Sequence, residues 1–118
     1  MEAIDILLKC LKSKRYIDDI ELARKEVTTE HINLKKEDDM FIRDSIIGLG
    51  TVLKEDLDEH YYITTVRMGF FGNVLTHAII LRQDSEADIA VHVHEGLVKQ
   101  HLAEKTIEKI KKLLAESR

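Results

Sequence analysis

The feature that most constrains the fold is the run at residues 73–95, which reads as two β-strands joined by a tight polar turn. Apolar and β-branched side chains dominate both halves of the run, and residues 83–86 interrupt them with the aspartate and serine that turns favour. The run also contains three of the six histidines. We therefore take this hairpin as the centre of the predicted fold and as the first place to look for chemistry.

Apolar residues at the helical period of 3.6 predict three helices around the hairpin. The first occupies residues 2–13 and the last residues 102–114. Between them, residues 36–53 begin with acidic side chains, which favour a helix N-terminus because the helix dipole is positive there, and continue with an apolar stripe. Because glycine lowers helix stability by about 1 kcal/mol relative to alanine, we expect this helix to end near Gly48 and residues 51–53 to be extended.

Residues 61–68 are rich in β-forming side chains and predict a third strand next to the hairpin. The three strands should form an antiparallel meander, because their connections are too short for a parallel crossover. Residues 17–25 fit either a helix or a loop that leads into a short strand at residues 27–34. Together these elements predict an α+β fold: an antiparallel meander sheet of three to four strands, packed against N-terminal helices and a long C-terminal helix.

Length and composition narrow the class of protein. A chain of 118 residues with 44% hydrophobic and 34% charged residues predicts one globular domain over residues 1–118. The 18 basic and 22 acidic residues give a formal net charge of −4, which argues against binding of nucleic acid through a surplus of cations. No apolar run approaches the roughly 20 residues of a membrane span. The lone Cys10 and the absence of a signal-peptide pattern predict a cytoplasmic protein.

Histidine spacing in the hairpin suggests a metal site as an alternative function. If the turn is centred between Ser85 and Glu86, His77 lies opposite His94, and His92 shares their face because strand side chains alternate. Imidazoles about 5 Å apart could hold a divalent metal. A one-residue slip would move His77 to the other face, and the competing interpretation is a polar, partly exposed sheet face that titrates near pH 6.5. Apart from this alternative, no cofactor is predicted.

Apolar surface gives the favoured functional interpretation. Leu75, Ile79 and Leu81 share the histidine face, which either the N-terminal helices or a second copy of the chain could cover. Phe70 and Phe71 at a hairpin tip are further candidates, either for contact with a partner or for the core. These five residues predict a small acidic, non-enzymatic module that recognises an unidentified protein partner or regulates it, and that forms a homodimer. The alternative is a small metal- or ligand-binding protein, conceivably an enzyme, that uses the three histidines.

Overall fold

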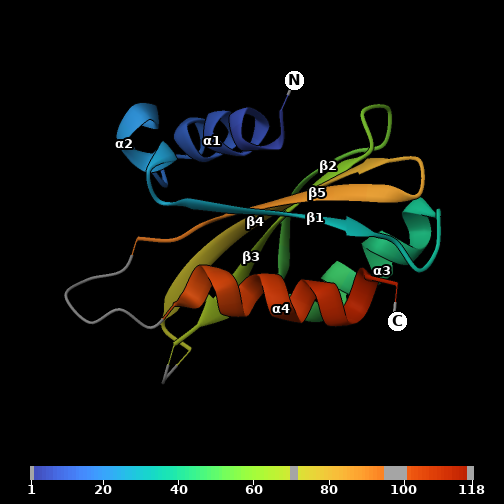
Figure 1. Ribbon diagram of the computed structural model, residues 1–118. Helices are drawn as coiled ribbons and strands as arrows, with labels where there is room; N and C mark the ends of the chain where they lie inside the picture. The colour runs from blue at the N-terminus through green and yellow to red at the C-terminus, as the bar shows by residue number, and fades with distance from the viewer. Residues whose placement is uncertain (1, 70–71, 95–100, 117–118) are drawn as a thin grey trace.

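A five-stranded antiparallel sheet lies at the centre of the computed structural model, which describes residues 2–69, 72–94 and 101–116 (Figure 1). The elements are, in chain order, α1 (Ala3–Ser13), α2 (Ile20–Arg24), β1 (Val27–Asn33), α3 (Asp39–Leu49), β2 (Thr51–Asp56), β3 (Tyr61–Met68), β4 (Val74–Gln83), β5 (Glu86–His92) and α4 (Leu102–Leu114). In the sheet, the strands follow the order β1-β5-β4-β3-β2. The predicted α+β class is confirmed, whereas the predicted number of strands is wrong because the sheet has five.

The strands beyond the predicted meander lie at the two edges of the sheet. β1 pairs with β5, and β2 pairs with β3. In β1 only Ile32 is fully buried, and β2 has no fully buried residue among those described. Edge strands therefore have little of the apolar alternation from which a strand is recognised in a sequence. The pairing of β1 with β5 also joins segments that are far apart in the chain, so no local pattern indicates it.

Aspartate side chains begin two of the helices. Asp19 accepts hydrogen bonds from two backbone N–H groups at the start of α2, at 2.9 and 3.2 Å. Asp38 accepts one from the N–H of Met40 at the start of α3, at 2.8 Å. Each aspartate satisfies N–H groups that have no partner within their own helix. The ambiguous residues 17–25 thus contain a short helix, and the helix predicted from the acidic opening is confirmed as α3.

Helices cover both faces of the sheet (Figure 1). On one face, α3 and α4 pack on a buried cluster that includes the sheet residues Tyr62, Val66, Ala78, Ile80, Ile89 and Val91. On the other face, α1 and α2 pack on a cluster that includes the sheet residues Tyr61, Ile63, Ile79, Leu81 and Ala90. An isolated helix as short as α1 has little stability in water, so α1 depends on its packing against the sheet. Each fully buried leucine of α1 contributes about 1.5–3 kcal/mol to the stability of the fold.

Asp39 joins the start of α3 to the sheet. Its carboxylate accepts a hydrogen bond from Nε of Arg82 in β4 at 2.9 Å, and its carbonyl oxygen accepts one from the hydroxyl of Tyr62 in β3 at 3.2 Å. The Arg82 guanidinium is the main reason that the pKa of Asp39 lies below its ordinary value. None of the helices in the described ranges is long and apolar enough to cross a bilayer.

Candidate functional site

The register of the β4–β5 hairpin decides how its histidines meet. Gln83 lies opposite Glu86, so the turn consists of Asp84 and Ser85 alone. Asp84 has a left-handed conformation, with φ of 56°, which aspartate adopts more readily than most residues. The centre of the turn is one residue earlier than predicted, and His77 pairs with His92. The predicted pairing of His77 with His94 is therefore wrong. A shift of one residue in the centre of the turn changes the cross-strand partner of His77 by two residues, from His94 to His92. Residues two apart in a strand share a face, so His92 is still on the face of His77.

His77 and His92 are buried, not part of an exposed polar face. Their exposed fractions are 4% and 5%. Nδ1 of His77 lies 3.0 Å from Oγ1 of Thr65, and the ring centroids of His77 and Tyr16 are 4.4 Å apart. Burial lowers the pKa of His77 to about 4, and the neighbouring His92 acts in the same direction. His77 is therefore neutral at physiological pH.

Glu26 connects the other two hairpin histidines. Nε2 of His92 lies 3.3 Å from Oε1 of Glu26, and Nδ1 of His94 lies 2.5 Å from Oε2. Burial raises the pKa of Glu26, but hydrogen bonds from His94 and His92 outweigh burial and hold the pKa below its ordinary value. Nδ1 of His92 is buried and has no hydrogen-bond partner among the described residues. Among residues 2–69, 72–94 and 101–116, no group of three or more histidine, cysteine, aspartate or glutamate side chains is arranged to hold a metal ion.

Helix α1 covers two of the five apolar residues predicted to contact a partner. Ile79 and Leu81 are buried in the cluster beneath α1. The N-terminal helices, and not a second copy of the chain, therefore cover these two residues. With exposed fractions of 0% and 7%, these two side chains offer almost no surface to a partner. Leu75 is half-buried and lines a hollow of about 400 Å³ together with Tyr16. Phe70 and Phe71 lie outside the described residues.

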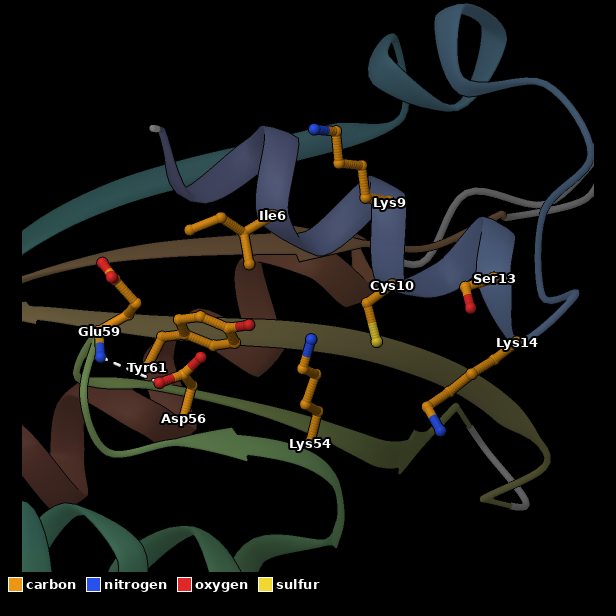
Figure 2. A pocket seen from close by; sticks show the side chains of 9 residues that line it. All are labelled: Ile6, Lys9, Cys10, Ser13, Lys14, Lys54, Asp56, Glu59 and Tyr61. Atoms are coloured by element: carbon orange, nitrogen blue, oxygen red, sulfur yellow. Dashed lines mark hydrogen bonds between the residues drawn. The ribbon is translucent and has the colours of Figure 1, made fainter.

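A cleft between α1 and the β2–β3 hairpin was not predicted from the sequence (Figure 2). Its volume of about 680 Å³ is within the range of small-molecule sites, which is about 300–1,000 Å³. The lining residues are Ile6, Lys9, Cys10, Ser13, Lys14, Lys54, Asp56, Glu59 and Tyr61. The cleft thus combines ammonium groups with an apolar and aromatic surface.

Local structure explains how these side chains reach the cleft. Ile6, Cys10 and Lys14 are four residues apart in turn, so they lie along one side of α1 and its end. In β2 the pairing with β3 shifts between Val52 and Lys54, which is a β-bulge. Because of this shift, Lys54 lies opposite Ile63 and shares its face beneath α1. With regular pairing Lys54 would point to the opposite face, so the bulge places this lysine in the cleft.

Basic and acidic groups follow one another along the cleft. Figure 2 shows Cys10 and Lys54 pointing toward each other, with Tyr61 beside Lys54 and Lys14 at the end of α1. Nζ of Lys54 lies 5.7 Å from the centroid of the Tyr61 ring. The phenol oxygen of Tyr61 raises the pKa of Lys54, which keeps this ammonium charged, and burial raises the pKa of the Cys10 thiol. The charge of Asp56, two residues from Lys54, also raises the pKa of Lys54. At the other end, Asp56 accepts a hydrogen bond from a backbone N–H in the turn after β2, at 3.0 Å.

Comparison with protein-family models, curated proteins and solved structures finds no match for this chain.

Proposed function

We propose that this protein is a binding module whose ligand is a small amphipathic anion, meaning an apolar or aromatic body that carries one acidic group. The observation that carries the proposal is the position of the Lys14 and Lys54 ammonium groups beside an apolar surface formed by Ile6, Cys10 and Tyr61. Burial of the ligand body against that surface contributes about 25 cal/mol per Å² of apolar area. The protein as a whole has a net charge of −4, so attraction of an anion has to come from these local cations.

The arrangement of charge supports one orientation of the ligand. Asp56 and Glu59 line the end of the cleft away from Lys14 and would repel an anion there. The acidic group of the ligand should therefore lie near Lys14 and Lys54, with its body against Tyr61. Tyr61 is only 6% exposed, so it adds the rim of its ring to the apolar wall of the cleft and offers no free face for stacking.

We expect the folded protein to bind 8-anilinonaphthalene-1-sulfonate, an aromatic sulfonate whose fluorescence rises in apolar sites. Reversal of both cations, in the variant Lys14→Glu/Lys54→Glu, should weaken this binding at least about tenfold, which corresponds to about 1.4 kcal/mol. Fluorescence titration gives the dissociation constant, and circular dichroism verifies that the variant is folded.

The matched control is Lys25→Glu/Lys105→Glu, which makes the same change in net charge at lysines that do not line the cleft. The control should bind the sulfonate as the wild type does. The uncharged N-phenyl-1-naphthylamine should bind the wild type and the cleft variant equally. Equal loss of sulfonate binding in the cleft and control variants would show that only net charge matters, and would refute the proposed site.

A second candidate function, association with a protein, is favoured by the exposed apolar side chains of α3 and α4. Met40, Ile47 and Leu113 are all exposed. This candidate keeps the interaction module predicted from the sequence but moves its surface from the sheet to the helix layer. A cytoplasmic location is part of both proposals and is supported by the single cysteine, Cys10.

A further inference from the structure

A groove of about 480 Å³ lies between α3 and α4. Both helices are on the opposite side of the sheet from α1 (Figure 1). Asp44, Gly48 and Leu49 line it from α3, and Lys109, Lys112 and Leu113 line it from α4. The hydroxyl of Ser45, at the same place, donates to the carbonyl oxygen of Phe41 and is therefore satisfied within α3. The groove thus offers mainly apolar surface with charges at its two walls.

Leu113 lines this groove and is exposed, and α3 has further exposed apolar side chains outside the lining. Ile47 is 55% exposed and Leu113 is 37% exposed. Met40, which is seven residues before Ile47 and so on the same side of α3, is exposed as well. Gly48 lines the groove without a side chain, and a Cβ atom at this position would meet no described atom within 4 Å. Apolar surface of this kind, with a polar rim, is typical of an interface between proteins.

The two walls of the groove carry opposite charges. Asp44 is on the α3 wall, and Lys109 and Lys112 are on the α4 wall. Within the described part of the chain, none of these three groups has an ion-pair partner. A surface with both signs in this arrangement is complementary to itself. A twofold axis along the groove would place α3 of one copy over α4 of the other, so that each carboxylate meets the ammonium groups of the other copy.

We propose that the occupant of this groove is a second copy of the chain, so that α3 and α4 form the interface of a homodimer. Ile47 and Leu113 form the apolar centre of the interface, and Gly48 allows the helix of the partner copy to approach closely. Asp44 pairs with Lys109 and Lys112 of the other copy at the rim. The cleft beneath α1 does not take part, so this proposal can fail or hold independently of ligand binding.

A charge-exchange experiment on the full chain tests the interface. Sedimentation velocity should detect a dimer of the wild type. Asp44→Lys places like charges together at both contacts of the dimer, and so does Lys109→Asp/Lys112→Asp. Each variant alone should therefore dissociate at least about tenfold more readily than the wild type. In an equimolar mixture of the two variants, both contacts of the heterodimer join opposite charges again, and the mixture should recover the dimer.

The controls separate association from folding. Ile47→Glu should give a monomer, whereas Leu22→Glu, at a residue of α2 that is 62% exposed, should leave the dimer unchanged. Circular dichroism and thermal unfolding verify that each variant is folded. A wild type that is monomeric at about 1 mM, where an association of only about −4 kcal/mol would be populated, would overturn the proposal. A mixture of the two charge variants that fails to form a dimer would also overturn it, and would leave the groove to a partner of another sequence.

Discussion

Replacement of Gly50 by alanine is expected to lower the free energy of unfolding by about 3 kcal/mol or more, or to prevent folding. Gly50 lies between α3 and β2 against the backbone of β3. A Cβ atom there would overlap the carbonyl oxygen of Thr65 and lie 3.0 Å from its carbonyl carbon. β3 is paired on both sides, with β2 and with β4, so its backbone cannot move away. The φ angle of Gly50 is −168°, an ordinary extended value, so the effect arises from lack of space.

Gly48 provides the matched control for this prediction. It is inside α3, and a Cβ atom there meets no neighbouring atom within 4 Å. Because alanine favours a helix more than glycine does, Gly48→Ala should raise the free energy of unfolding by about 0.5–1 kcal/mol when both glycine variants are made in the Ile47→Glu background, which is expected to be monomeric. Urea denaturation of the two variants measures both effects. Similar midpoints for Gly48→Ala and Gly50→Ala would contradict the close approach of Gly50 to β3.

Acidification from pH 7 to pH 4 is expected to lower the free energy of unfolding by about 3 kcal/mol through His77 alone. Burial gives His77 a pKa of about 4 in the folded protein, compared with 6.5 in an unfolded chain. Between these values the unfolded chain binds a proton that the folded protein excludes. The contribution of neutral His77 to stability is therefore fully present above pH 6.5 and is lost as the pH falls toward 4.

The neighbours of His77 determine which other groups contribute to the loss of stability in acid. The Tyr16 ring packs against the His77 ring at a tilt of 48°, and Oγ1 of Thr65 lies 3.0 Å from Nδ1 of His77. His92 is the cross-strand neighbour of His77, and Nε2 of His92 lies 3.3 Å from Oε1 of Glu26. Burial also lowers the pKa of His92, so this residue adds to the loss of stability in acid. Urea denaturation between pH 7 and pH 4 should show a smaller loss for His77→Asn than for the wild type.

His31 serves as the control in the same pH series. Its exposed imidazole pairs with Asp88 and Glu86, and the pKa of His31 is raised chiefly by the hydrogen bond to Asp88. A raised pKa contributes stability that is present in acid and is lost as the pH rises, so the sign is opposite to that of His77. His31→Asn should therefore not reduce the loss of stability in acid. An equal loss in the His77→Asn variant and the wild type would refute the role of buried His77.

The proposed ligand cleft and the proposed dimer interface lie on opposite sides of the sheet (Figure 1). A dimer formed through α3 and α4 would leave the cleft beneath α1 open. Variants in Lys54 and Asp44 should therefore act independently on ligand binding and on association, because separate sites without shared contacts have additive effects.

Elements with strong local patterns could be predicted from the sequence. α1 and α4 have apolar residues at the helical period, and β3 agrees with its predicted residues 61–68. The β4–β5 hairpin follows from its turn residues, and the side-chain alternation of β4 predicted that both of its faces need a cover. These signals arise from residues close together in the chain, where backbone geometry alone decides which side chains share a face.

Tertiary structure decided the features that depend on contacts between distant segments. β1 became a strand through its pairing with β5, and α1, not a second copy of the chain, covers Ile79 and Leu81. A difference of one residue in the centre of the turn replaced His94 by His92 opposite His77. The cleft depends on the bulge in β2, which turns Lys54 to the face beneath α1. The sequence by itself determined the helices, the central strands and their apolar faces, because periodicity is a local property. Register, bulges and the covering of each face result from pairing and packing across the chain, where alternatives that differ by one residue have nearly the same local pattern.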